Sequence, residues 1–382
     1  MIATTVRAIP VAKPDLGEAE AAAARQAIIS GWVTQGPQVG DFEREFAQYV
    51  GAPHACAVSS CTTALHLALH ALGVGPGDQV VTVSHSFIAT ANAVRYCGAE
   101  PVFVDIDPQT YNLDAQLLRA AITPRTRAIL VVHQMGLPCD WPTVLRVATA
   151  NGLPVIEDAA CAIGSEIRMD GSWAKVGQPH GTVACFSFHP RKIMTTGDGG
   201  MITTRDPELD RRFRLLRQHG MNVSDVVRHS ATQVIFEEYV EVGFNYRMTD
   251  IQAAVGRVQL RRLPDFLRQR RRLASRYANA LAEIPGLEPP AIPDYVRPSF
   301  QAYPVRVTDE YPLSRDELMQ ALLEQGISTR RGIMNAHQEA PYASPMRSLP
   351  HSEAARDGVI LLPLYSQMTD EEQDYVIEAL KR

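Results

Sequence analysis

Helical and strand-like patterns alternate through the first two thirds of this chain, and few architectures are compatible with that order. Amphipathic or Ala-rich stretches predict helices at residues 18–30, 41–50 and 62–72, with Asp41 as the N-cap of the second. Short apolar stretches predict buried strands at residues 79–83, 101–104, 128–132, 154–156 and 182–188. Buried strands joined by crossover helices form mostly parallel sheets. We therefore predict an α/β fold with a mostly parallel central sheet flanked by helices.

The last third of the chain has a different pattern, which predicts a second domain. A long basic helical region covers residues 248–284, is interrupted at Pro264 and contains the charge run 268–272, which is typical of a solvated helix face. An irregular linker is predicted at residues 284–298, followed by strands at 302–307 and 358–364 and helices at 314–325 and 369–381. These patterns predict a large α/β domain at residues 1–255 and a smaller α+β domain at residues 256–382.

Polar side chains follow two of the predicted strands. Asp158 comes after the strand at 154–156, and Ser187 and Lys192 come at and after the end of the strand at 182–188. If these strands are parallel neighbours, the three side chains emerge at the same edge of the sheet, where ligands bind in such folds. A lysine that loses its proton can form a Schiff base with an aldehyde cofactor, and a carboxylate can keep the ring nitrogen of pyridoxal phosphate protonated. The pattern favours pyridoxal phosphate chemistry.

The phosphate of such a cofactor needs donors of its own. Residues 59–62 (SSCT) precede a predicted helix, so their hydroxyl and backbone N–H groups lie where a helix N-terminus favours an anion. Each of these features taken alone also fits a structural role: the Ser/Thr run as a helix cap, Asp158 as an N-cap, Lys192 as a surface residue and Phe87 as a core residue. The Gly-rich residues 196–200 match neither G-x-x-x-x-G-K-[ST] nor G-x-G-x-x-G.

Charge and cysteine content limit the partners and the compartment. Lys and Arg total 37 against 42 Asp and Glu, a net charge of −5, which leaves no net positive field for nucleic acid or for an anionic membrane. The six cysteines form no C-x-x-C pair, and with the eleven histidines they show no metal-ligand spacing, so we expect no metal site. No secretory leader is evident at the N-terminus. We expect a cytoplasmic protein with free thiols.

Several motifs in one order are similar to a known family. The sequence resembles the DegT/DnrJ/EryC1/StrS sugar aminotransferases, which have the pyridoxal-phosphate-dependent transferase fold of type I, from about Pro14 to the C-terminus. The resemblance is carried by Lys192 and by residues 31–37 (GWVTQGP), 64–69 (ALHLAL), 87–93 (FIATANA), 157–160 (EDAA), 186–189 (FSFH), 196–200 (TGDGG) and 243–248 (GFNYRM).

The resemblance implies a role for individual residues. Lys192 matches the Schiff-base lysine, which also moves the proton between substrate and cofactor. Among the cofactor-binding positions, Asp158 matches the partner of the ring nitrogen and Phe87 the aromatic that stacks on the ring, while the phosphate positions are Cys61, Thr62, Ser187 and Asn245. Because the other subunit supplies Asn245 in the family, the resemblance implies a homodimer with shared active sites. Residues 32–37 and 329–337 resemble substrate-facing loops of the family, so Thr34, Arg330, Arg331 and His337 are candidate substrate-binding residues, with an arginine as a candidate for holding a diphosphate. His189 is a further candidate. Structural roles are the alternative for both histidines, and an ordinary exposed pair is the alternative for the two arginines.

Two positions depart from the family pattern. The family usually has Gly where this chain has Cys61, so the backbone N–H there remains a phosphate donor if the local φ is negative or the loop shifts. Three residues after Asp158 the family places Gln, His or Glu against the cofactor ring, whereas this chain has Cys161. A thiol at that position offers a weak interaction in place of a strong one.

The implied function is amino transfer to a keto sugar. The resemblance implies an aminotransferase that uses pyridoxal phosphate, with pyridoxamine phosphate as its second form, to move an amino group from L-glutamate to a nucleotide-linked 4-keto-6-deoxyhexose. Alternatives on the same scaffold are a 3-keto sugar aminotransferase, a cyclitol aminotransferase and a sugar dehydratase. The presence of Lys192 favours transamination over dehydration, since the dehydrating relatives have histidine there. A non-catalytic ligand-binding or regulatory protein is the alternative of another class.

Overall fold

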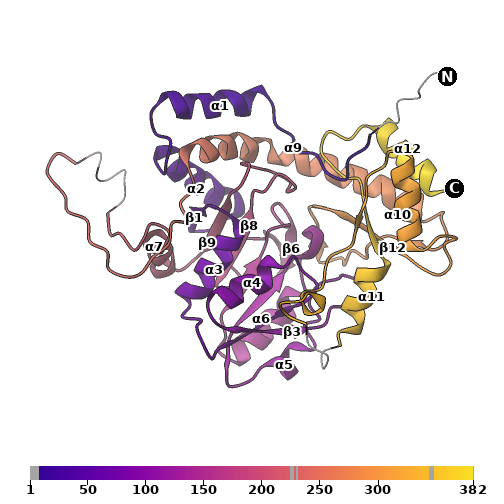
Figure 1. The fold of residues 1–382 in the computed structure, drawn as a ribbon, viewed down its shortest axis with the longest axis horizontal. Helices are drawn as coiled ribbons and strands as arrows, with labels where there is room; N and C mark the ends of the chain where they lie inside the picture. Colours follow the sequence, from indigo (N-terminus) through magenta and orange to yellow (C-terminus); the bar gives the residue numbers. More distant parts are fainter. Residues whose placement is uncertain (1–7, 224–227, 229–230, 344–347, 382) are drawn as a thin grey trace.

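A computed structural model describes residues 8–223, 228, 231–343 and 348–381 of the chain, in two packed units joined by one long helix (Figure 1). The first seven residues, part of the segment considered for a leader, lie outside the described residues. Within the described ranges, no helix combines the length and the hydropathy that a bilayer-crossing segment requires.

The larger unit is built on a seven-stranded sheet. Its order is β1-β9-β8-β5-β4-β2-β3, and all neighbouring pairs are parallel except those of β9 with β1 and β8. The prediction of a mostly parallel sheet is therefore confirmed. The strands are β1 (His54–Val58), β2 (Gln79–Val83), β3 (Glu100–Val104), β4 (Thr126–Val132), β5 (Val155–Asp158), β8 (Val183–Ser187) and β9 (Gly200–Thr204).

Helices cover both faces of this sheet. Alternate residues of β1 belong to different apolar clusters, Cys56 and Val58 with the residues of α3 and α6, Ala55 and Ala57 with those of α2 and α9. The helices of this unit and its connections are α1 (Glu18–Ile29), α2 (Pro37–Val50), α3 (Cys61–Ala71), α4 (Ala89–Tyr96), α5 (Leu118–Ala121), η1 (Gln134–Gly136), α6 (Trp141–Ala150) and α7 (Pro207–Leu216). A small sheet, β11-β6-β7, adds β6 (Glu166–Met169), β7 (Ser172–Lys175) and β11 (Val296–Arg297).

The smaller unit is an antiparallel sheet, β10-β12-β14-β13, packed against helices. Its apolar cluster includes Leu273 and Tyr277 of α9, Tyr303 and Ile360 of the sheet, and Ile9 from the N-terminal segment. The elements are β10 (Leu287–Glu288), β12 (Tyr303–Val307), α10 (Arg315–Glu324), β13 (Arg330–Arg331), η2 (Ala336–Gln338), α11 (Pro350–Gly358), β14 (Val359–Leu362) and α12 (Asp370–Leu380).

Helix α9 (Asp250–Leu281) links the two units and continues through Pro264 (Figure 1). The predicted interruption there is wrong. A proline removes one backbone hydrogen bond, but Leu263 and Phe266 beside it are buried in the cluster under the large sheet, and this packing holds the helix together. The predicted division at residues 255 and 256 falls within the first turns of α9.

Two other local predictions are corrected by long-range contacts. Helix α2 begins at Pro37 rather than after Asp41, because the carboxylate of Asp250 accepts the backbone N–H groups of Gly36, Gln38 and Val39 at 2.8–3.0 Å. The basic run is not wholly solvated either. Arg270 is 5% exposed and donates to carbonyl oxygens of Phe300, Gln301 and Leu364.

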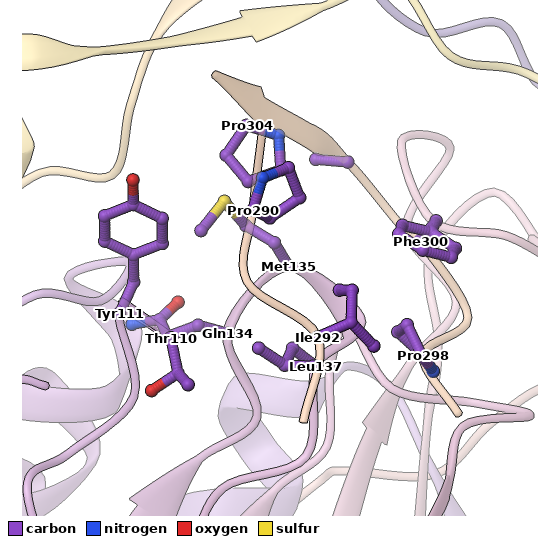
Figure 2. Close-up of a pocket in the computed structure, with 11 residues that line it drawn as sticks. Thr110, Tyr111, Gln134, Met135, Leu137, Pro290, Ile292, Pro298, Phe300 and Pro304 are labelled. Carbon is purple, nitrogen blue, oxygen red and sulfur yellow. The ribbon is translucent and has the colours of Figure 1, made fainter. Parts of the chain in front are cut away.

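An apolar cleft lies where residues 290–304, which follow α9, cross the large unit, and Figure 2 shows its lining. Three lining residues, Tyr111, Met135 and Phe300, have φ values of 60°, 54° and 51°, in the left-handed region that side chains other than glycine rarely adopt. The loop of Met135 also supports residues elsewhere, because the Gln134 amide donates to the backbone carbonyl of His85. The loop that contains the left-handed Met135 is thus hydrogen-bonded to the segment that begins at His85.

Candidate active site

The carboxyl ends of β5 and β8 place Asp158 at the edge of the large sheet. The two strands are parallel neighbours, which is the condition for the side chains of Asp158 and Ser187 to emerge at one edge, and Asp158 lies opposite Cys185. The Asp158 carboxylate is 6% exposed; its Oδ2 accepts from the Thr90 hydroxyl at 2.8 Å and its Oδ1 from the Ala160 N–H at 3.2 Å. Burial raises the pKa of Asp158 above the usual range, although both donors oppose that shift. A cation bound against this carboxylate would restore its charged form.

Lys192 lies in a folded loop between β8 and β9. The loop is closed by backbone hydrogen bonds from Phe188 to Gly199 at 2.9 Å, from Lys192 to His189 at 2.8 Å and from Thr196 to Phe188 at 3.0 Å. The Lys192 Nζ donates to the Cys161 Sγ at 3.1 Å. Burial alone would lower the pKa of Lys192, but the neighbouring Cys161 and Asp158 raise it. The amine and the carboxylate therefore share one site.

The N-terminus of α3 offers free hydrogen-bond donors to an anion. Ser60 caps the helix by accepting from the Thr63 N–H at 3.1 Å, and no acceptor within the described residues takes the N–H groups of Cys61 and Thr62. Cys61 is the first residue of the helix and is not among the residues with positive φ. The condition for Cys61 to keep a usable backbone donor is met.

Ser187 is brought to the same place by a close backbone approach. It lies opposite Gly200 in the pairing of β8 with β9. A Cβ at Gly200 would lie 2.5 Å from the Ser60 carbonyl and 2.8 Å from the Cys61 nitrogen, so only glycine permits this contact. Among the residues that the structure describes, the Ser187 hydroxyl accepts only a long contact, 3.4 Å, from the His189 N–H, and it remains able to donate to a phosphate.

Phe87 is an exposed aromatic three residues before Thr90, the residue that donates to the buried Asp158 carboxylate. Its side chain is 66% exposed, although it lies in the turn between β2 and α4 whose Thr90 contacts Asp158. The expectation from the residue alone, a place in the core, does not hold. An aromatic ring left open next to a ring-nitrogen partner suits stacking on a flat cofactor.

Asn245 and Thr34 are both exposed. The Asn245 Oδ1 accepts from the Arg247 Nε at 3.2 Å, and the next residue, Tyr246, accepts the Ser59 N–H at 2.8 Å through its carbonyl. Asn245 is therefore close to Ser59, the first of the residues 59–62 expected to bind the cofactor phosphate, in its own chain. Thr34 lies in the loop before α2, and its carbonyl accepts the Asp250 N–H at 2.8 Å.

The remaining candidates divide into two groups. Arg330 and Arg331 form the exposed strand β13, and burial together with the charge of Arg191 lowers the pKa of Arg330. His189 accepts the Arg191 N–H through Nδ1 at 3.2 Å. His337 differs, because it is buried and both ring nitrogens are engaged, with the Ser84 hydroxyl at 2.7 Å and the Glu353 carboxylate at 3.2 Å. These contacts tie the two units together and leave no ring nitrogen for substrate.

Sequence reasoning missed two hydroxyls of the site. Ser86 and Thr90 are buried. Their hydroxyl oxygens lie 2.8 Å apart, and the Thr90 hydroxyl donates to Asp158. The sequence feature that could have identified them is that Ser86 and Thr90 flank Phe87 between a buried strand and the first turn of the next helix. With them, the donor set fits pyridoxal phosphate: a lysine for its aldehyde, a carboxylate for its ring nitrogen, an open aromatic for its ring and free N–H groups for its phosphate.

Comparison with known proteins finds relatives that match this chain over nearly its whole length. A Bacillus subtilis protein, spore coat polysaccharide biosynthesis protein SpsC, is 39% identical over 381 residues, covering 98% of this chain and 96% of that protein. The aminotransferase TlmJ from Streptoalloteichus hindustanus superposes with a TM-score of 0.89 at 37% identity, covering 98% of both chains. Spr1654 from Streptococcus pneumoniae, solved in PMP and PLP forms, reaches 0.90 at 30% identity in its PMP form, with 98% of both chains covered.

These structures confirm the predicted fold class. The sequence model of the DegT/DnrJ/EryC1/StrS aminotransferase family matches residues 14–381, which is nearly the whole chain. The protein belongs to the DegT/DnrJ/EryC1/StrS aminotransferase family.

Proposed function

We propose that this aminotransferase, which uses pyridoxal phosphate, transfers an amino group from L-glutamate to a nucleotide-linked keto sugar, with a 4-keto-6-deoxyhexose as the acceptor. The observation that carries the proposal is the convergence of Lys192, Asp158 and the open N-terminus of α3 on one sheet edge. When bound, the cofactor supplies an aldehyde that takes up the amino group and a ring that withdraws electrons.

The residues of the chain divide the work of the reaction. Lys192 anchors the cofactor and, once displaced by an amino acid, carries the proton to and from the substrate carbon through its Nζ. Asp158 holds the proton of the ring nitrogen, and Phe87 packs on the ring. Cys61, Thr62 and Ser187 hold the phosphate. The name of the polysaccharide-biosynthesis relative supports a sugar acceptor.

The proposal is tested by supplying each substrate to the purified protein. With pyridoxal phosphate bound, L-glutamate should convert the visible absorption band of the enzyme to that of pyridoxamine phosphate and release 2-oxoglutarate. A panel of keto sugars, with and without a nucleotide and with the ketone at carbon 3 or 4, should then be screened for an amine product by mass spectrometry. If the enzyme converts a cyclitol or a 3-keto sugar in preference to the 4-keto sugar, the proposed acceptor is wrong.

Arg330 is proposed to hold the diphosphate of the nucleotide. It lies near Arg191, which directly precedes Lys192, and two cations held close together favour an anion between them. Successive residues of a strand point to opposite faces, so Arg331 points away from this position and provides a matched control.

We expect Arg330→Ala to raise the KM for the nucleotide sugar about 10- to 100-fold, the effect of losing a charge-assisted contact. The reaction with L-glutamate should stay within about twofold of the wild type. Arg331→Ala should change neither by more than about threefold. Steady-state kinetics with each substrate varied in turn measures these values. A rise in the KM for L-glutamate instead would show that Arg330 binds the carboxylate of the donor.

The proposed homodimer is supported by an exposed apolar arm. Residues 231–243 extend away from the sheets beside α7 (Figure 1). Three of the side chains on this arm, Val234, Phe236 and Val242, are 82–86% exposed. Apolar side chains displayed in this way are typical of protein interfaces. Cytoplasmic location is proposed because all six cysteines are free thiols.

Shared active sites predict complementation between two inactive variants. Lys192→Ala and Asn245→Ala chains, unfolded together and refolded, should regain up to about a quarter of the wild-type activity, since half of the dimers are hybrids with one intact site. Each variant refolded alone is the control. If Asn245 serves the site of its own chain, every site of a hybrid carries one substitution and no activity returns.

A further inference from the structure

A chain of two buried hydroxyls leads to the Asp158 carboxylate. Thr90 is 1% exposed and its Oγ1 donates to the Asp158 Oδ2 at 2.8 Å; Ser86 is 4% exposed and its Oγ lies 2.8 Å from the Thr90 Oγ1. An ionised carboxylate can only accept, so the single proton of Thr90 points to Asp158. Ser86 must then donate to Thr90, and both hydrogen bonds run toward Asp158.

The two hydrogen bonds that run from Ser86 through Thr90 to Asp158 affect both the orientation and the charge of the carboxylate. One Asp158 oxygen is bound by Thr90 and the other by the Ala160 N–H, so the plane of the carboxylate is set from two sides. Burial favours the neutral acid, whereas donors to the carboxylate favour the charged form. Successive hydrogen bonds in a buried environment strengthen one another. The hydroxyl of Ser86 therefore acts on Asp158 without touching it.

Residues 86–90, which contain both hydroxyls, also contain Phe87. The Thr90 N–H donates to the Phe87 carbonyl at 3.1 Å, which closes the turn between Ser86 and Thr90. The hydroxyl chain thus couples the ring-stacking residue to the carboxylate that faces the ring nitrogen. We propose that Thr90 and Ser86 are positioning residues, which orient Asp158 and keep its carboxylate ionised toward the ring nitrogen of the cofactor.

The inference rests on the use of pyridoxal phosphate and is independent of the identity of the sugar. Its test uses pyridoxal phosphate labelled with ¹⁵N in the ring, because the ¹⁵N chemical shift separates a protonated from an unprotonated ring nitrogen. The samples are holoenzymes of the wild type, Thr90→Val, Thr90→Ser and Ser86→Ala. Valine matches the shape of threonine and removes the donor, whereas serine keeps it.

In Thr90→Val, loss of the donor raises the pKa of Asp158 further, and the shared proton moves from the ring nitrogen toward the carboxylate. The ¹⁵N resonance should shift toward the unprotonated value. The kcat with L-glutamate should fall about 10- to 100-fold while its KM stays within about threefold. Ser86→Ala should shift the resonance in the same direction by a smaller amount, and Thr90→Ser should match the wild type.

A purely structural role would give a different result. If Thr90 only pins α4 to the sheet, Thr90→Val lowers the thermal midpoint of the apoprotein and leaves the ¹⁵N shift and kcat unchanged, which overturns the proposal. If Thr90→Val does not fold, Ser86→Ala decides, because an unchanged ¹⁵N shift in that variant contradicts a hydrogen-bond chain. Failure to aminate the tested sugars would bear on the proposed acceptor and leave these measurements intact.

Discussion

Lys192→Ala is expected to lose at least about 10³-fold in the rate at which L-glutamate is converted to 2-oxoglutarate, because it removes both the covalent anchor and the proton carrier. The substituted side chain is a loop residue whose Nζ contacts the Cys161 thiol, so the fold should survive. A single-turnover assay with cofactor-saturated protein measures the loss directly. Urea unfolding of the apoprotein checks that stability is retained.

Two variants separate catalysis from charge. Lys192→Arg keeps a cation near Asp158 but has a pKa too high for proton transfer, so it should be as inactive as Lys192→Ala. Cys161→Ala removes the thiol that Nζ contacts and should keep most of the activity. Turnover by Lys192→Arg within about tenfold of the wild type would mean that the lysine acts only as a cation.

Arg270→Met is expected to destabilise the protein by about 3–5 kcal/mol, the largest stability effect that we expect from a single substitution. The guanidinium is buried and its donors reach Phe300 at 2.9 Å, Gln301 at 2.6 Å and Leu364 at 3.1 Å, all at carbonyl oxygens. Methionine keeps the apolar stem of the side chain and leaves these carbonyls without a donor. The midpoint of urea unfolding measures the change.

Arg268 provides the matched control for this substitution. It lies in the same basic run, but its side chain is 74% exposed and its ion pair with Asp265 is on the surface. Arg268→Met should change stability by no more than about 0.5 kcal/mol. Similar midpoints for the two variants would show that the carbonyls around Arg270 find other donors. Burial lowers the pKa of Arg270 to about 10, which shows how much solvation this cation gives up.

Local sequence patterns predicted the strands β2, β3, β4, β5 and β8 and the core of the site, whereas β1 was not predicted. Each of these strands has an apolar centre, and the parallel pairing of β5 with β8 then places Asp158 and Ser187 at one edge of the sheet. The negative φ required at Cys61 also follows from a local feature, since a helix begins there. Such inferences depend only on residues close together in the sequence and on the regular geometry of strands and helices.

The features that could not be predicted depend on residues far apart in the sequence. The start of α2 is set by Asp250, which lies more than two hundred residues later. The burial of Arg270 depends on the carbonyls of Phe300, which precedes β12, and of Leu364, which follows β14. His337 is bound by Ser84 and Glu353, contacts that no spacing reveals. In each case a polar side chain satisfies groups that only the folded chain brings near.

The place of Ile9 has a consequence for synthesis on the ribosome. Ile9 is translated long before Ile327, yet its backbone pairs with the segment around that residue, donating to the Gly326 carbonyl and accepting from the Ser328 N–H, both at 2.8 Å. Ile9 is also part of the apolar cluster of the smaller unit, whose other members all lie at residue 273 or later. The nascent chain must therefore keep the segment around Ile9 unpaired until residue 327 has been made. Chaperone binding to stalled nascent chains should persist at this segment until residue 327 has left the exit tunnel.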